Sequence, residues 1–203
     1  MKKGGFMKDA LILFAITVVA GGCLGGVYEI TKEPIERANQ AAQIAAYQEV
    51  LPEAVDFNSD GMDEKIAASA EEIASQGYGN VYIDSAAAAV DASGNNIGYV
   101  VSSTSGDGYG GEVKISVGID GDGAVTGIAF LSLSETPGLG MNATQDSFKG
   151  QFAGKNVDKL TVTKSATGAD DEIVAMSGAT VTSEAVTNAD NAAIYFAKNC
   201  IAE

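Results

Sequence analysis

A run of 19 residues without a charged side chain, from Ala10 to Tyr28, constrains this chain more than any other feature. A helix needs about 20 mostly apolar residues to cross a bilayer, so the run predicts one transmembrane helix over residues 10–30. Three lysines lie before the run, and an acidic residue, Glu29, follows it. Because basic flanks stay in the cytoplasm, we expect residues 1–9 to be cytoplasmic and the rest of the chain to be extracytoplasmic.

Two other interpretations of the same segment stay open. A short basic start followed by an apolar core also fits a cleaved signal peptide. Residues 20–23, Ala-Gly-Gly-Cys, weakly resemble the small-residue box that precedes a lipidated bacterial cysteine, which here would be Cys23. Glycines on both sides of Cys23 let another helix pack closely, which favours a helix in contact with membrane lipid and membrane partners.

The charge of the chain excludes several classes of function. Residues 1–37 carry five of the 12 basic and four of the 27 acidic residues, so 7 basic and 23 acidic residues remain, with a net charge of −16. Such a surface repels phosphate backbones, and we expect no nucleic-acid binding.

The chain has no histidine, and its two cysteines stand far apart. Hydrolytic triads and metal sites are therefore not expected, and the sequence indicates no catalytic residue.

Hydrophobic periodicity predicts an α+β domain after the apolar run. Apolar residues at helical spacing indicate helices at residues 34–51, 62–76 and 183–199. Between residues 81 and 133 the pattern changes to period two, with glycine-rich turns, which predicts antiparallel strands. The expected strands are residues 81–91, 97–104, 113–120 and 125–133, with another near 157–163. The fold class is thus one N-terminal transmembrane helix, a helical connector at residues 31–80 and an antiparallel-sheet domain at residues 81–203, flanked by helices.

The run from Met176 to Ser183 is the most informative for chemistry. Gly178 and Ala179 carry almost no side chain, so another molecule can approach the backbone closely. The start of a helix offers free N–H groups and the positive end of its dipole, which suits a phosphate. The hydroxyl groups in the run also fit a plainer interpretation, in which they only cap the helix.

These residues resemble a known family. The sequence Ser177-Gly178-Ala179-Thr180, followed by Thr182-Ser183, resembles the flavinylation motif of the FMN-binding domain in RnfG and NqrC. In that family the last threonine of the motif forms a phosphoester with FMN, which implies a covalent FMN on Thr180 and makes the chain a phosphoprotein. A threonine hydroxyl is a poor nucleophile without a base, so a separate flavin transferase is implied. The family usually has an aspartate three residues before the motif, where this chain has Val174.

Further segments carry the same resemblance. Residues 135–140 resemble the ETPGLG loop of RnfG-like proteins, and residues 108–113 resemble their GYGG segment. Residues 31–35 resemble their sequence after the membrane anchor. The resemblance implies that the cofactor contacts come from the following residues: Tyr109, Gly110, Glu135, Thr136, Pro137, Gly138, Leu139, Gly140, Ser177, Gly178, Ala179, Thr180, Thr182 and Ser183.

The function implied is that of the RnfG subunit of an Rnf complex, which couples electron exchange between ferredoxin and NAD to moving Na+ or H+ across a membrane. This subunit would relay electrons through covalent FMN, as part of a translocase rather than as an independent catalyst. Its expected place is the inner cell membrane, crossed once, with other Rnf subunits as partners. The alternatives are an NqrC-type subunit of Na+-translocating NADH:quinone reductase, a stand-alone extracytoplasmic flavin carrier, and a binding lipoprotein without redox function.

Overall fold

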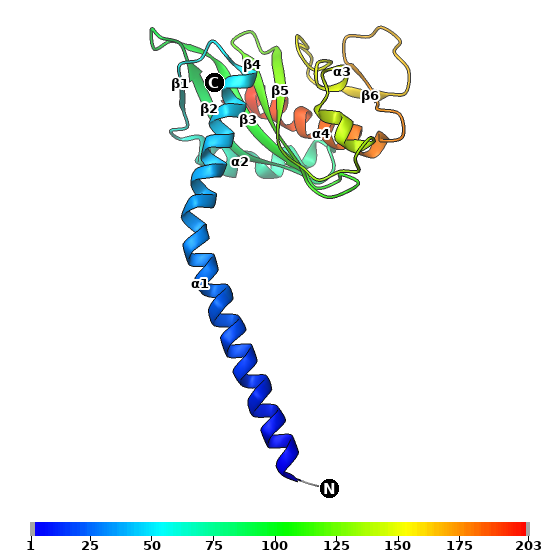
Figure 1. Ribbon diagram of the computed structural model, residues 1–203. Coiled ribbons are helices and arrows are strands. Elements are labelled where there is room, and N and C mark those ends of the chain that lie inside the picture. Colours follow the sequence, from blue (N-terminus) through cyan, green and yellow to red (C-terminus); the bar gives the residue numbers. More distant parts are fainter. Residues whose placement is uncertain (1–2, 202–203) are drawn as a thin grey trace. The chain divides into compact units, whose positions relative to one another are not determined.

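The computed structural model describes residues 3–201, and the chain divides after Ala42 into two compact units. Helix α1, Lys3–Val50, runs for 48 residues, with Pro34 inside it (Figure 1). The two helices predicted at residues 10–30 and 34–51 are therefore one helix, and the predicted break between them was wrong. Proline removes a single backbone donor, while the turns on either side keep their own hydrogen bonds, so the helix continues.

The apolar part of α1 has the properties of a membrane-spanning segment. The helix contains an 18-residue window with a mean hydropathy of 2.3, and none of that window is buried. Large apolar side chains such as Leu13, Phe14 and Val19 are all exposed. Exposed apolar side chains over this length are what a helix surrounded by lipid requires, and the helix is long and apolar enough to cross a membrane.

The second unit is built on a five-stranded antiparallel sheet in which each strand pairs with the next one along the chain. The strands are β1 (Asp56–Asn58), β2 (Val81–Val90), β3 (Asn96–Ser105), β4 (Val113–Asp120) and β5 (Val125–Leu133). Gly94 and Gly123 turn the chain between strands with φ of 81° and 82°. The α+β fold class and the four long strands are confirmed, whereas β1 is too short to show period two.

Helices cover both faces of this sheet. Helix α2 (Met62–Ser75) packs on β2, and helix α4 (Thr180–Phe196) packs on β2, β3 and β4, so that the two helices enclose the main core (Figure 1). On the opposite face, Tyr47 and Val50 near the end of α1 pack against Val100 of β3. Alternation along the strands therefore puts apolar side chains on each face, and the antiparallel sheet is buried on both sides.

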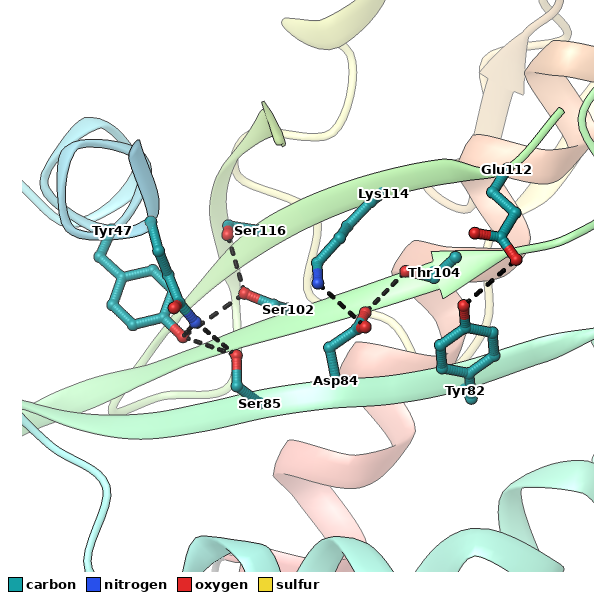
Figure 2. A network of polar contacts seen from close by, with 10 residues as sticks. Tyr47, Tyr82, Asp84, Ser85, Ser102, Thr104, Glu112, Lys114 and Ser116 are labelled. Carbon is teal, nitrogen blue, oxygen red and sulfur yellow. Dashed lines mark hydrogen bonds and ion pairs between the residues drawn. The ribbon is translucent and has the colours of Figure 1, made fainter. Parts of the chain in front are cut away.

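A row of hydroxyl groups joins the end of α1 to its face of the sheet (Figure 2). Tyr47 Oη lies 3.0 Å from Ser85 Oγ and accepts a hydrogen bond from the Gln43 amide at 2.7 Å. Ser102 Oγ lies 3.0 Å from Ser116 Oγ and 3.4 Å from Tyr47 Oη. These groups are largely buried, and their mutual hydrogen bonds offset the cost of removing them from water.

The remaining elements lie between β5 and the end of the chain. They are η1 (Gly140–Thr144), α3 (Asp146–Lys149), the parallel strand pair β6 (Thr161–Thr163) and β7 (Glu172–Val174), and the π-helical turn η2 (Ala197–Ile201). The Asn191 side chain of α4 holds the chain before β6 by bonding both the N–H and the C=O of Leu160, at 2.6 and 3.0 Å. Helix α4 begins at Thr180, not at Ser183 as predicted, because the N–H of Ser183 already donates to the carbonyl of Ala179.

Candidate functional site

Three segments far apart in the sequence meet at the start of α4. A Cβ added at Gly110, in the connection from β3 to β4, would collide with the carbonyl oxygen of Ser134. A Cβ added at Gly140 would lie 2.7 Å from Glu135 Oε2 and 2.8 Å from Thr182 Oγ1. Such contacts disfavour any side chain at these two glycines. The glycines therefore allow the segments at residues 108–112, 134–140 and 175–182 to pack directly on one another.

The three segments enclose a cavity of about 550 Å³. This volume lies within the range of about 300–1,000 Å³ that is typical of small-molecule and cofactor sites. Three apolar side chains at the cavity, Tyr109, Leu139 and Val181, are exposed, with Tyr109 at 76%. The cavity is lined by Tyr109, Glu135, Thr136, Leu139, Gly140, Gly178, Ala179, Thr180, Val181 and Thr182.

The first turn of α4 forms one wall of the cavity. Thr180 is the first residue of the helix, and within residues 3–201 no side chain caps this end. The first backbone bond of the helix is the one from Ser183 N to Ala179 O, at 3.0 Å, so the N–H groups of Thr180, Val181 and Thr182 precede the hydrogen-bond ladder. Together with the helix dipole, they make this wall attractive to a phosphate.

The hydroxyl groups of this turn differ in what they bind. The Ser183 hydroxyl accepts a hydrogen bond from Met176 N at 3.0 Å and donates one to Ala179 O at 2.9 Å. The half-buried Thr180 hydroxyl has no hydrogen-bond partner among the described residues. Ser183 thus holds the loop, whereas the Thr180 hydroxyl is unpartnered within residues 3–201. The plain capping interpretation does not account for Thr180, which follows the cap position occupied by Ala179.

Glu135 supplies the charge at this cavity. Its side chain is 8% exposed, and in the part of the chain that the structure describes its Oε1 atom has no hydrogen-bond partner. Buried polar atoms are normally paired, because an unpaired one loses its hydration without compensation. An unpaired carboxylate oxygen in the wall of a cavity is therefore suited to a donor group on a bound molecule.

The structure separates the predicted site residues into two groups. Nine of the predicted residues line the cavity. The other five do not: Gly110, Pro137, Gly138, Ser177 and Ser183. Gly138 and Gly178 both have φ of 77°, so they make turns that other residues adopt only with strain. Val181 was missed by the sequence interpretation. An apolar residue in the first turn of a helix, among hydroxyl residues, was the signal that could have identified it.

One further polar group lies on α4 away from the cavity. Asp190 is completely buried, and neither carboxylate oxygen has a hydrogen-bond partner within residues 3–201. Burial disfavours the charged form and raises the pKa of Asp190 from 3.8 to about 8. Sequence patterns gave no sign of this group, because an aspartate in a helix is usually solvated.

The residues at the cavity fit FMN. The open N–H groups at the start of α4 suit its phosphate, the unpaired Glu135 oxygen suits a ring donor, and the apolar side chains of Tyr109 and Leu139 suit the faces of a planar ring system. Gly140 and Gly178 in the lining carry no side chain that would keep a flat ring from the backbone.

Comparisons with known proteins match an FMN-binding domain over the part of the chain that contains the cavity. Residues 108–195 match the model of the FMN-binding domain, and residues 1–50 match that of the RnfG N-terminal region. The G subunit of the Na(+)-translocating ferredoxin:NAD(+) oxidoreductase complex of Acetobacterium woodii is 38% identical over 95% of this chain and 91% of its own length. The G subunit of the ion-translocating oxidoreductase complex of Methanosarcina acetivorans is 33% identical over 93% of each chain.

A solved structure is similar to part of the domain. The crystal structure of Shewanella oneidensis NqrC has a TM-score of 0.47 and 22% identity, covering 58% of this chain and 61% of that chain. A similarity of this size does not assign a function. The two relatives match nearly their whole length at more than 30% identity, and both family models fall on the same chain. The chain therefore belongs to the RnfG family, the G subunits of ion-translocating oxidoreductase complexes.

Proposed function

We propose that this chain carries FMN in covalent linkage on Thr180 and passes electrons as the RnfG subunit of an Rnf complex. The observation that carries the proposal is the position of Thr180: its hydroxyl has no partner among the described residues and lies in the wall of a cavity of about 550 Å³ at a helix start. FMN supplies the redox chemistry when bound, and the chain sets its position and surroundings.

Formation of the bond requires an activated donor. In the proposed step, Thr180 Oγ1 attacks the flavin-side phosphorus of a flavin dinucleotide, a new P–O bond forms, and the pyrophosphate P–O bond breaks. The nucleoside monophosphate leaves with the bonding electrons, and a base takes the hydroxyl proton. Since this chain has no histidine, the base that such a transfer uses is expected on a separate flavin transferase.

Each wall of the cavity has a distinct proposed task. The N–H groups at the start of α4 stabilise the phosphate that joins FMN to Thr180. Leu139 and Tyr109 shield the ring, and Thr136 and Thr182 add hydroxyl groups to the wall. Glu135 accepts a hydrogen bond from the ring system and fixes its orientation, while its charge disfavours extra negative charge on the flavin. The predicted residues that do not line the cavity shape the loops instead: Ser183, Gly110, Pro137, Gly138 and Ser177.

The proposal also places the chain in the cell. Residues 10–30 would cross the inner membrane once, with residues 1–9 in the cytoplasm and the FMN-binding domain, residues 81–203, outside. Exposed apolar side chains along α1 and the RnfG N-terminal match support contact with lipid and with other membrane subunits. The predicted connector, residues 31–80, would lead from one to the other, and from Gln43 onward it belongs to the compact unit that holds the sheet.

The test is mass spectrometry of the denatured full-length chain after co-expression with a flavin transferase, combined with in-gel flavin fluorescence and peptide mapping. The wild-type chain should gain the mass of one FMN phosphoester on the peptide that contains Thr180. A Thr180→Val variant should lose the label and keep its fold. A Thr161→Val variant, changed at an exposed position on β6 outside the cavity lining, should keep the label. Covalent flavin on the Thr180→Val protein would show that the attachment site is elsewhere.

A further inference from the structure

Gln151 makes an unusual pair of hydrogen bonds to the strand that leads into the site. Its Oε1 atom accepts from the N–H of Val174 at 2.8 Å, and its Nε2 atom donates to the carbonyl of the same residue at 3.2 Å. The Nε2 atom also donates to the carbonyl of Ser147 at 3.3 Å. A primary amide offers an acceptor oxygen and two donor hydrogens, so this side chain bonds the strand as the peptide group of a neighbouring strand would.

The position of Val174 gives these bonds their importance. It is the last residue of β7, which pairs with β6, and three residues later the chain reaches Ser177. The following N–H, that of Ala175, donates to Thr163 O at 2.7 Å, and Met176 N donates to Ser183 Oγ. The loop before Thr180 is thus fixed residue by residue, and Gln151 fixes its first residue.

The backbone of Gln151 is held independently of its side chain. Its neighbours Phe148 and Phe152 are buried, at 2% and 0% exposure, and their rings pack edge to face at 5.6 Å. This packing anchors α3 and the turn after it. Removing the amide of Gln151 therefore releases Val174 without removing a side chain from the core.

We propose that Gln151 is a positioning residue for the modification of Thr180: its amide presets the loop at residues 174–179, so the acceptor hydroxyl is in place before any flavin arrives. This inference rests on the proposed function. Its physical basis is that the loop is bonded to fixed groups on β6 and α4 as well as to Gln151, which follows α3. A preset acceptor lowers the entropic cost of aligning the hydroxyl with the attacked phosphorus.

The test compares rates of flavin attachment on the full-length protein in detergent, with fixed transferase and flavin dinucleotide. Gln151→Met keeps the length and packing of the side chain but removes its hydrogen bonds to Val174, and Gln151→Ala removes the whole side chain. Each should lower kcat/KM for attachment roughly tenfold, because small displacements of a reacting group are costly. Gln151→Glu keeps the acceptor for Val174 N–H but sets a carboxylate oxygen against the carbonyls of Val174 and Ser147, so it should also lower kcat/KM.

Gln145→Ala is the matched control. Within residues 3–201 its side chain bonds only to Asn142 Oδ1, at 3.1 Å, outside the loop, and the variant should behave as wild type.

A second readout needs no transferase: in the unmodified Gln151→Met protein, amide hydrogen exchange at Val174 should accelerate while the melting temperature stays within a few degrees. A wild-type rate of attachment in Gln151→Met would overturn the inference but not the proposed function. A wild-type chain that acquires no flavin would instead overturn the proposed function, and the inference with it.

Discussion

At the residue scale, neighbouring hydroxyl groups of the same chemistry have different tasks because of what they bind. Ser183 uses both its donor and its acceptor capacity on the loop backbone, whereas the Thr180 hydroxyl has no partner within residues 3–201. Sequence identified the motif through its resemblance to a family, because the same hydroxyl residues at a helix start also fit a plain cap. It could not divide the tasks, because the hydrogen bond from Met176 N depends on how the loop folds back.

Asp190 gives a prediction at the same scale. Burial raises its pKa from 3.8 to about 8, so between these values the side chain is neutral in the folded chain and ionised in the unfolded chain. Unfolding then releases a proton. This group therefore lowers the free energy of unfolding by about 1.4 kcal/mol for each unit by which the pH rises. The contribution is fully present below the unfolded pKa and is lost as pH rises through the folded one. Asp190→Asn should flatten this slope between about pH 5 and 8.

Urea denaturation of the full-length protein at several pH values measures the slope. Asp60→Asn, at an exposed position, is the control and should leave the slope unchanged. Equal slopes in the wild type and the Asp190→Asn protein over that pH range would contradict the burial of a neutral aspartic acid.

At the scale of the elements, sequence predicted what local patterning specifies and missed what tertiary contacts create. The four long strands have period two and glycine turns, so their bounds were found within about two residues of the observed ones. Strands β1 and β7 have three residues each, too few for a period to be detected. Strand β7 depends on the amide of Gln151 and on pairing with β6, neither of which leaves a pattern in its own sequence.

The turn at Gly138 leads to a second prediction. Its φ of 77° is strained for any β-branched residue, at a cost of roughly 1–2 kcal/mol, even though an added Cβ would meet open space in the described part of the chain. Gly138→Val should therefore distort the loop that carries Leu139 and Gly140, and lower the fluorescence anisotropy of the attached flavin. Gly94→Val, with φ of 81° and equally open space in the β2–β3 turn, should cost similar stability and leave the anisotropy unchanged. Equal anisotropy in both variants would show that this loop does not restrain the flavin.

At the scale of the whole molecule, the membrane assignment of α1 can be tested by charge. Each arginine at the centre of a spanning helix costs about 2.5–3.5 kcal/mol of insertion free energy. The double variant Ile16→Arg/Val19→Arg should therefore shift most of the chain from the membrane pellet to the supernatant after alkaline extraction. Gln40→Arg, at an exposed position beyond the apolar run, should stay in the pellet. Full retention of the double variant would contradict a spanning segment at residues 10–30.

The cavity is complete only when three segments that lie far apart along the chain have come together, as the glycine contacts between residues 110 and 134 and between 140 and 182 require. A nascent or misfolded chain has the same threonine but lacks the wall around it. Flavin would then be attached only to folded chains, and the fluorescence of the covalent flavin would measure how many chains have folded correctly. In a cell under heat stress, the labelled fraction would report the folded yield of this protein without any added probe.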